Sequence, residues 1–528
     1  LGKCGCTRMV QGGYNVALAA GDSVERHFMD TIEGGKWLPD QDLAWKLVTL
    51  AIERIHELEN ELGCFFDRNP DGTVHQKAFA GQTFDRTVHK GDLTGIEIMN
   101  RLAEQVWARK IGRLEEHRAV ELIKTRAGDA LAGVLMIDMR TGEYVFVRAK
   151  AVLLATGGGP TMYRYHTPSG DKSCDGLAMA LRAGLPLRDM EMVQFHPTGL
   201  LAGPHTRMTG TVLEEGLRGA GGYLLNGAKE RFMPKYDPLA ERATRDFVSR
   251  AMVTEMRKGS VTPNGGLYIS MAHLGPEKVA KDFKGMVERC ADCGFDLAGG
   301  LVEVVPTAHY MMGGVEFKPD CTTALPGLFV AGEDAGGVHG ANRLGGNGVA
   351  NSTVFGAVAG DTMAAWVKKQ GLREPDQAAI VAAVARCEPK AAASHGSLEP
   401  LRERLYEVMW EKVGIIRDAA GLNSALSELS AIDAELSNTG IADANRAFNL
   451  TWHDRLNLKS LVATSQVIAQ AALAREDSRG AHYREDFPEA GPLETSTYTS
   501  AQLAGGKLEI GMKPVAFTRV RPGQSLLS

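Results

Sequence analysis

Three absences narrow what this sequence can be. Its 528 residues include eight cysteines, too few and too scattered for a disulfide scaffold. No run of about 18 uninterrupted apolar residues occurs, so no segment is predicted to span a membrane. The formal net charge is −5, and no basic domain of the kind that binds nucleic acid stands out. The remaining composition, 44% hydrophobic and 23% charged, is that of an ordinary globular protein of roughly two to four domains.

Two local signals are also missing. Cys290 and Cys293 form one isolated CxxC without a second cysteine pair, so no metal site is predicted. No secretory signal peptide opens the sequence. We therefore expect the cytoplasm, or the cytoplasmic face of a membrane, as the location.

Glycine, in contrast, is abundant. The chain has 61 glycines, about one residue in nine, against a usual share of about 7%. Glycine clusters surround His309, Glu333 and Arg343 in a region that is otherwise apolar and strand-like. Glycine lets a loop fold close to a ligand, so loops that also carry His and Arg indicate a grip on a small anion beside a cofactor.

Two apolar runs that end in glycine give the main signal for the fold. Residues 150–156 and 325–331 are typical of buried parallel strands, and they lead into Gly157 and Gly332. Such strand ends favour a dinucleotide bound across the carboxyl edge of a parallel sheet, although a tight turn without a ligand gives the same pattern. The rest of the chain is predicted as helices at 40–62 and 94–110, short strands over 117–149, an inserted mixed domain over 195–305, helices over 372–485 and a polar, irregular end over 490–528.

Three further stretches, at residues 173–184, 189–199 and 213–222, carry a resemblance to a known family. Together with the glycine-rich loops they resemble the flavoprotein family of succinate dehydrogenases, fumarate reductases and L-aspartate oxidases, from Cys6 to about Pro488. The resemblance implies an α/β fold, in which an FAD-binding Rossmann-like domain carries an inserted α+β capping domain and is followed by a C-terminal helical domain. The implied boundaries are 1–194 and 309–371 for the FAD-binding domain, 195–308 for the capping domain, 372–489 for the helical domain and 490–528 for an extension.

The reaction of such a family sets what the side chains must do. Interconversion of succinate and fumarate exchanges a hydride with flavin and a proton with the adjacent carbon, so the protein must orient the substrate and clamp its carboxylates. His196, His309 and Arg343 are candidates, because Arg offers a planar fork and His an adjustable donor. The resemblance places these three at the substrate, together with Gln194 and Gly346.

Arg245 matches the catalytic acid of the family. Arginine has a reference pKa of about 12.5 or higher, so it can serve only if a relay restores its proton. Glu215 and Arg218 match the family's relay, and Glu215 is the candidate that passes protons to Arg245. Taken alone, the pair of Arg245 and Asp246 would more often be an exposed ion pair of little consequence. The order of several motifs along the chain favours the catalytic interpretation.

FAD is the cofactor that the resemblance implies. Many members of the family carry a histidine covalently joined to FAD, and Cys6 occupies that position here. We therefore expect noncovalent FAD, while a cysteinyl link stays open. Glu333 by itself would also suit a surface carboxylate. The predicted cofactor-binding residues are Thr7, Gln11, Gly12, Gly13, Ala155, Thr156, Gly157, Asp175, Glu333, Asn347, Gly348 and Val349.

Departures from the family pattern keep two alternatives open. Glu214 stands where the family has threonine, and a further carboxylate would repel a dicarboxylate unless it is turned away, protonated or paired with a cation. An L-aspartate oxidase, whose substrate carries an ammonium group, is the first alternative, although residues 79–95 lack the glutamate with which those oxidases hold it. No GxGxxG precedes Gly13, so we expect that the chain as given is truncated. If the phosphate cradle is instead lost, a flavin-deficient, noncatalytic subunit is the second alternative.

The expected partners follow from the resemblance alone. They are a small dicarboxylate substrate and an iron-sulfur subunit that leads to a membrane anchor, whereas aspartate oxidases react with oxygen or fumarate by themselves. No nucleic-acid partner is expected, and any membrane association would be peripheral and would arise only through partners. The charged run at residues 475–488 is either a docking segment or a solvated loop.

Overall fold

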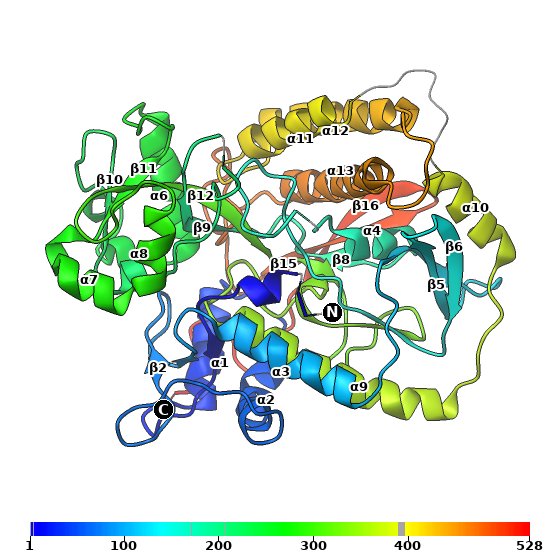
Figure 1. Ribbon diagram of the computed structural model, residues 1–528, viewed down its shortest axis with the longest axis horizontal. Coiled ribbons are helices and arrows are strands. Elements are labelled where there is room, and N and C mark those ends of the chain that lie inside the picture. Colours follow the sequence, from blue (N-terminus) through cyan, green and yellow to red (C-terminus); the bar gives the residue numbers. More distant parts are fainter. Residues whose placement is uncertain (1, 4, 171, 205, 389–396, 528) are drawn as a thin grey trace.

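The computed structural model describes residues 2–3, 5–170, 172–204, 206–388 and 397–527 (Figure 1). The two helices predicted near the start of the chain are present. α2 (Gln41–Asn60) begins after Asp40, whose carboxylate accepts the main-chain N–H groups of Asp42 and Leu43, and one face of the helix is buried. The second predicted helix is α3 (Thr94–Ala108). A further helix, α1 (Val24–Gly34), precedes α2.

The two glycine-terminated runs pair as parallel strands, as predicted. β7 (Val152–Leu154) and β14 (Leu328–Val330) run side by side, so their carboxyl ends lie together. Asp334, in the short helix η5 (Gly332–Asp334), joins the two ends, because its carboxylate accepts the N–H of Thr156 and, at 3.1 Å, that of Gly157. The long helix α9 (Asn347–Lys369) packs against η5.

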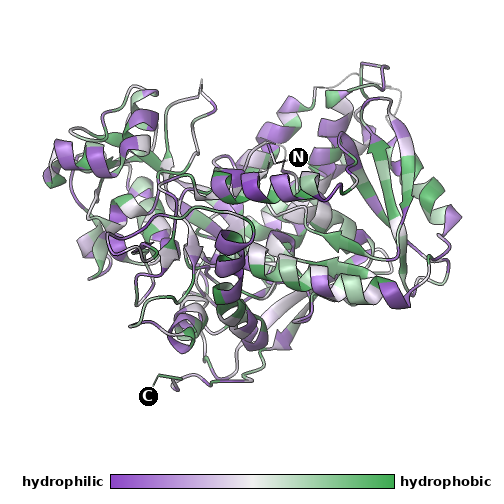
Figure 2. Cartoon of the chain, turned by 60° about the horizontal axis from the view of Figure 1, so that its bottom comes forward, coloured by the Kyte–Doolittle hydropathy of each residue, from purple (hydrophilic) through white to green (hydrophobic). Residues whose placement is uncertain are grey.

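Two antiparallel sheets flank this pair. One is the meander predicted over residues 117–149, and Figure 2 shows its strands as strongly hydrophobic. Its apolar side chains pack with the buried Trp452. The strands are β4 (His117–Lys124), β5 (Leu131–Asp138) and β6 (Glu143–Arg148) in the meander, and β1 (Tyr14–Asn15), β3 (Thr87–Val88) and β2 (Gln76–Lys77) in the other sheet.

A separate lobe, at the left of Figure 1, is built on an antiparallel sheet with the strand order β10-β11-β12-β9. Its two long strands run from the lobe toward the middle of the molecule, and His196 pairs with Thr307 across them. The predicted capping domain falls on this lobe. Its elements are β9 (Val193–Leu200), α5 (Gly216–Gly219), β10 (Tyr223–Leu225), η2 (Met233–Lys235), η3 (Ala240–Arg242), α6 (Arg245–Arg257), β11 (Leu267–Ser270), η4 (Ala272–Leu274), α7 (Pro276–Asp282), α8 (Lys284–Ala291) and β12 (Val302–Met311).

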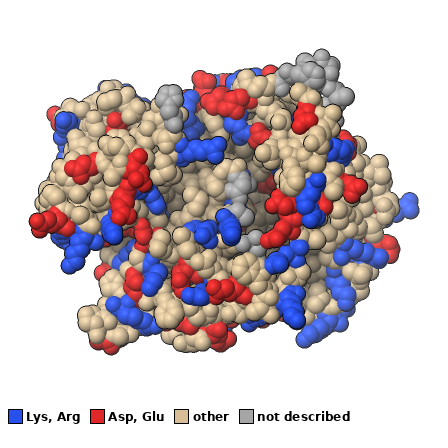
Figure 3. Space-filling view, viewed as in Figure 1, with Lys and Arg blue, Asp and Glu red and all other residues tan. Residues whose placement is uncertain are grey.

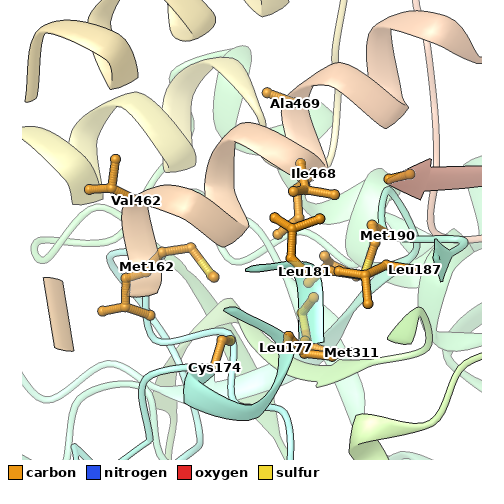
Figure 4. Close-up of a cluster of buried hydrophobic side chains, with 14 of the residues drawn as sticks. Met162, Cys174, Leu177, Leu181, Leu187, Met190, Met311, Val462, Ile468 and Ala469 are labelled. Atoms are coloured by element: carbon orange, nitrogen blue, oxygen red, sulfur yellow. The ribbon is translucent and has the colours of Figure 1, made fainter. Parts of the chain in front are cut away.

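Helices dominate the chain after α9, as predicted. Figure 4 shows Val462 and Ile468 packed above Leu177 and Leu181 in a large apolar core, which joins the helical part to α4 (Asp175–Arg182). Among the described residues, no helix is both long enough and apolar enough to cross a lipid bilayer. The helices are α10 (Gln377–Cys387), α11 (Glu399–Lys412), α12 (Ala419–Asn438) and α13 (Leu450–Ala474).

The last residues form a hairpin, which corrects the expectation of an irregular end over 490–528. β15 (Thr497–Ala504) and β16 (Lys507–Pro514) pair antiparallel around Gly505 and Gly506. Two glycines between alternating runs are a hairpin signal, which the polar composition obscured. β15 also pairs with β8 (Leu187–Arg188), which in turn pairs with β13 (Gly314–Val315), so the hairpin extends an inner sheet.

The charged run at residues 475–488 differs from a solvated loop, because its arginines are buried. Arg475 donates to Oε1 of Glu191 at 2.6 Å, and Arg484 pairs with Asp486 at 2.7 Å. Buried charges have to be paired in this way, and the pairs fix the segment against the rest of the fold.

Candidate active site

The predicted acid and its relay lie in direct contact. Arg245 opens α6, and its Nη2 lies 2.6 Å from Oε2 of Glu215. The other carboxylate oxygen of Glu215 accepts from Nη2 of Arg218 at 3.0 Å. Nη1 of Arg245 also donates to the amide oxygen of Gln194 at 3.1 Å. All four side chains are buried, so residues that the sequence spreads over three segments form one connected cluster.

Neighbouring charges set the ionisation of Glu215. Burial acts to raise the pKa of its carboxyl group, but the guanidinium groups of Arg245 and Arg218 outweigh burial and hold this pKa below its ordinary value. Burial lowers the pKa of Arg218. Glu215 is thus an ionised carboxylate between two cations, and it can receive a proton from one and pass it to the other.

His196 on β9 and His309 on β12 face each other, with ring centroids 5.5 Å apart. Nδ1 of His196 accepts the main-chain N–H of Thr198 at 3.3 Å, which leaves the proton of the neutral ring on Nε2. Nδ1 of His309 lies 2.8 Å from the hydroxyl of Thr167. Burial and then the charge of Arg245 hold the pKa of both rings well below its usual value, so both are neutral near pH 7.

Arg343 is a buried cation that lacks a full set of partners. Within the described ranges, its Nε has no hydrogen-bond partner, and Nη1 reaches the carbonyl of Leu344 at 3.4 Å. Its guanidinium lies 4.3 Å from the centre of the Tyr310 ring. Burial and then the charge of Arg245 lower the pKa of Arg343 to about 10. Because an uncompensated buried cation is costly, this arrangement favours an anionic ligand.

The glycine loop turns directly into α9. Gly346 has a φ of +87°, and a Cβ on it would meet Oδ1 of Asn15 at 2.1 Å, so a side chain is excluded there. The amide oxygen of Asn347 accepts from Asn15 at 2.8 Å and lies 2.9 Å from Nε2 of His27, so this side chain fixes the loop and does not reach outward. The first turn of α9 offers an anion-binding helix N-terminus at Gly348 and Val349.

The carboxyl ends of β7 and β14 offer a place for FAD. Ala155 directly follows β7, whose last residue Leu154 is buried, and Ala155 is itself exposed, which leaves an open apolar edge there. Beside this edge, Oε1 of Glu333 accepts the N–H of Met311 at 2.9 Å, and burial raises the pKa of Glu333 to about 7. Thr156 and Gly157 are held by Asp334. Figure 3 shows the molecule hollowed in the middle of the face seen in Figure 1. An apolar edge, a carboxylate for ribose hydroxyls and a helix N-terminus for phosphate together fit the cofactor.

The candidate cofactor residues near the amino terminus pack closely on the loop at Phe79 and on strand β3. A Cβ on Gly12 would meet the Phe79 ring at 2.8 Å, and one on Gly13 would meet the carbonyl of Val88 at 2.2 Å. Gly13, which also has a φ of +145°, therefore requires glycine, and a side chain at Gly12 would have to displace the Phe79 ring. Thr7 lies in the short helix η1 (Cys6–Met9), which packs on α3.

Two other cofactor candidates are engaged by the protein itself. The amide oxygen of Gln11 accepts from the guanidinium of Arg289 on α8, which links the amino-terminal loop to the capping lobe. The carboxylate of Asp175 accepts from Nη2 of Arg118, with both oxygens at 2.9 Å. The Asp175 carboxylate is therefore engaged by Arg118, while the start of the helix that it begins lies close to Thr156, which a Cβ on Gly176 would meet at 2.2 Å.

Glu214 lies in a different charge environment from Glu215. Its Oε2 is 3.6 Å from Nζ of Lys77. Burial raises the pKa of Glu214, and Lys77 opposes this rise. The sequence left open whether Glu214 is turned away, protonated or paired with a cation, and the structure shows it paired with the cation of Lys77. Glu214 is thus no counter-charge to Arg245 or Arg343.

Sequence reasoning missed two residues of this site, Tyr310 and Asp334. A regular strand would send His309 and Tyr310 to opposite faces, but the pairing of β12 with β9 shifts register between Ala308 and Tyr310. This irregularity lets Tyr310 support Arg343 while His309 faces His196. For Asp334, the signal was its position beside Glu333 at a strand end.

Comparison with known families fits this geometry. Residues 2–349 match the family model of an FAD binding domain, and residues 402–526 match that of the fumarate reductase flavoprotein C-terminal domain. The chain belongs to the succinate dehydrogenase and fumarate reductase flavoprotein family. This assignment confirms three predictions made from the sequence. FAD is the cofactor of the protein, the protein is an oxidoreductase, and its fold is α/β with a helical C-terminal domain.

Relatives of this family match most of the chain. One subunit of the CoM/CoB fumarate reductase of Methanothermobacter marburgensis is 41% identical over 501 residues, which cover 93% of this chain and 89% of the relative. The fumarate reductase flavoprotein subunit of Escherichia coli is 34% identical over 503 residues, which cover 91% of this chain and 82% of the relative.

Solved structures of the family superpose closely. A variant of the E. coli quinol fumarate reductase flavoprotein FrdA has a TM-score of 0.91 and 32% identity, covering 99% of this chain and 92% of that one. Mycobacterium smegmatis Sdh1 in complex with UQ1 has a TM-score of 0.85 and 34% identity, covering 98% and 89%.

Proposed function

We propose that this flavoprotein interconverts fumarate and succinate. The observation that carries the proposal is the charge of the buried site. The guanidinium groups of Arg218, Arg245 and Arg343 bring three positive charges, and Glu215 brings one negative charge, which leaves an excess of two. A dicarboxylate dianion would neutralise this excess in a place where unpaired charge is costly.

The residues suggest a division of work. Arg343 and the neutral His309 would clamp one carboxylate, and the neutral His196, next to Gln194, would donate to the other. FAD, when bound, supplies or accepts the hydride. In the direction of reduction, Arg245 gives a proton to the substrate carbon, and Glu215 passes the proton of Arg218 to Arg245.

Amino-acid oxidation has less support. A second carboxylate near Arg343 would suit an ammonium group, but Glu214 lies beside Lys77. Residues 79–95 contain no glutamate that would replace it. The geometry therefore favours a substrate with two carboxylates and no cation.

Anaerobic flavin spectroscopy tests the proposal. Reduced, FAD-loaded protein is titrated with fumarate, and oxidised protein with succinate and with L-aspartate. We expect rapid reoxidation by fumarate and no bleaching by L-aspartate. Bleaching by L-aspartate would establish the oxidase instead, and protein that shows no flavin band even after refolding with FAD would establish a noncatalytic subunit.

We infer that FAD is held without a covalent bond. The support is that Cys6, at the start of η1, stands at the position where relatives with linked flavin have histidine. Acid precipitation of the holoprotein should leave the flavin in the supernatant. If the flavin of the wild-type protein stays in the pellet, and that of Cys6→Ser is released into the supernatant, the protein has a cysteinyl link.

We infer further that electrons pass to or from an iron-sulfur subunit. The relatives from M. marburgensis and E. coli are both named as subunits of fumarate reductases, which supports a partner chain. Membrane contact would then be made through partners. Copurification of an iron-sulfur protein with the tagged chain from its native host would support this inference, and full activity of the chain alone with its physiological donor would contradict it.

A further inference from the structure

The proton relay of this site is closed off from solvent. Arg245, Glu215 and Arg218 are 7%, 3% and 0% exposed. Each reduction of substrate consumes one proton, and that proton has to come from water. A group beyond Arg218 must therefore connect the relay to the surface.

Glu241 is the next titratable residue in that direction. Nη1 of Arg218 donates to the main-chain carbonyl of Glu241 at 2.7 Å. The Glu241 side chain is itself buried, and its carboxylate is among the charges that raise the pKa of Arg218 against the effect of burial. Glu241 thus touches the relay through its backbone and acts on it through its charge.

Arg231 continues the path outward. It holds Glu241 with a two-pronged contact, in which Nε donates to Oε1 at 2.9 Å and Nη2 donates to Oε2 at 2.6 Å. The Arg231 side chain is 37% exposed, whereas that of Glu241 is 4% exposed. Arg231 therefore brings this ion pair to the surface of the capping lobe.

The outer part of the path is held rigidly. The Arg231 guanidinium lies 3.8 Å from the centre of the Tyr223 ring, and the exposed His273 stacks on Tyr223 at 3.8 Å with an interplanar angle of 5°. The N–H of Leu224 also donates to Oε1 of Glu241 at 3.1 Å. These contacts hold Glu241, and with it the carbonyl that accepts from Arg218, in one position.

We propose that Glu241, held by Arg231, governs the outer end of the proton relay: its main-chain carbonyl orients Arg218, and its carboxylate stabilises the protonated guanidinium that solvent must restore in each turnover. In one turnover a proton leaves Arg245 for the substrate carbon, one passes from Arg218 through Glu215 to Arg245, and one from water returns to Arg218, which Glu241 holds in place. One proton is consumed in total, and the hydride comes from the flavin. This inference rests on the proposed function, and Glu241 is a positioning residue that does not touch substrate.

A purely structural role for Glu241 has a matched control in the same lobe. Glu255 on α6 is also a buried carboxylate, and it accepts from the exposed Lys258 at 2.7 Å and from the hydroxyl of Tyr236 at 2.5 Å. It has no contact with Arg218, Glu215 or Arg245 among the described residues. If only the loss of a buried ion pair matters, Glu241→Gln and Glu255→Gln should therefore lower kcat to a similar extent.

The test measures fumarate reduction by the FAD-loaded full chain with reduced methyl viologen, in H2O and in D2O. We expect Glu241→Gln to lower kcat about tenfold or more, to leave KM within about threefold and to increase the solvent isotope effect on kcat. Glu255→Gln should leave both kcat and the isotope effect near wild type. A Glu241→Gln enzyme with wild-type kcat, or one that shares its loss with Glu255→Gln, would overturn the inference.

A second variant keeps the test decisive if Glu241→Gln does not fold. Arg231→Met leaves Glu241 and its bond from Leu224 in place, and it should slow kcat with the same rise in isotope effect. An unchanged isotope effect in this variant would count against the relay. Wild-type protein that binds FAD and does not reduce fumarate would instead refute the proposed function, so the two failures are distinct.

Discussion

Nη2 of Arg245 lies 2.6 Å from Oε2 of Glu215, and both side chains are buried. This contact joins the first residue of α6 to a residue just before α5. It gives a guanidinium group, which is a poor acid in water, a carboxylate that can replace its proton. The same carboxylate holds Arg218, so one anion organises two of the three cations of the site.

Replacement of the acid should abolish turnover without unfolding the protein. Arg245→Ala is expected to lower kcat for fumarate reduction by about 10³-fold or more, because the proposed proton donor is lost while Arg343, the proposed clamp, is kept. Arg250→Ala, on the same helix, serves as the control. Steady-state rates and thermal melting of both variants check this, and Arg245→Ala activity within about tenfold of wild type would remove Arg245 from its role.

Replacement of the clamp should act mainly on substrate affinity. Charge-assisted hydrogen bonds contribute roughly 1.5 to 3 kcal/mol each, so Arg343→Met is expected to raise KM for fumarate by about 10- to 100-fold. Arg343→Lys keeps the charge and loses the planar fork, and it should lie between Met and wild type. Equal KM values for the lysine variant and wild type would show that only the charge matters.

Replacement of Glu214 should change how the free energy of unfolding depends on pH, and it should leave the choice of substrate unchanged. Its pKa is raised by burial, so the folded state binds this proton more tightly than the unfolded state does. The free energy of unfolding should therefore fall as pH rises from the ordinary glutamate pKa to the raised one, and Glu214→Gln should remove that part of the fall. Urea unfolding between pH 4 and 8 would measure it. A gain of L-aspartate oxidation or a loss of fumarate reduction in Glu214→Gln would contradict this assignment.

Glu333 should make FAD binding depend on pH. Burial raises its pKa to about 7, and the ionised carboxylate accepts hydrogen bonds from ribose hydroxyls better than the protonated form. We expect FAD affinity, measured by fluorescence quenching in the flavin-free protein, to increase as pH rises through about 7. Glu333→Gln should bind FAD more weakly at pH 8 and show a flat profile over the same range. A profile that stays unchanged in Glu333→Gln would exclude this residue as the cause.

Local patterns in the sequence account for the helices and strands that were predicted correctly. The capped helix at Asp40 and the parallel strands β7 and β14 follow from periodicity, capping and glycine at strand ends, which depend on neighbours in the sequence. The hairpin of β15 and β16 was readable by the same rules and was missed, because its polar residues hid the alternation around Gly505 and Gly506.

The grouping of Arg245, Glu215, His196, His309 and Arg343 was also within reach of the sequence, through motifs that resemble a known family. Their contacts were not. The register shift before Tyr310 arises only when β12 pairs with β9, and no local rule predicts where a strand will bulge.

The sequence by itself determined the α/β class, the FAD-binding family and the types of residue that we propose for a dicarboxylate site, because these depend on local pattern and motif order. Only the tertiary structure decided which charges meet. Glu214 pairs with Lys77, Asp175 with Arg118, and Glu241 with Arg231 at the outer side of Arg218. Electrostatic effects depend on distance and burial in space, and the separation of residues along a chain does not specify either.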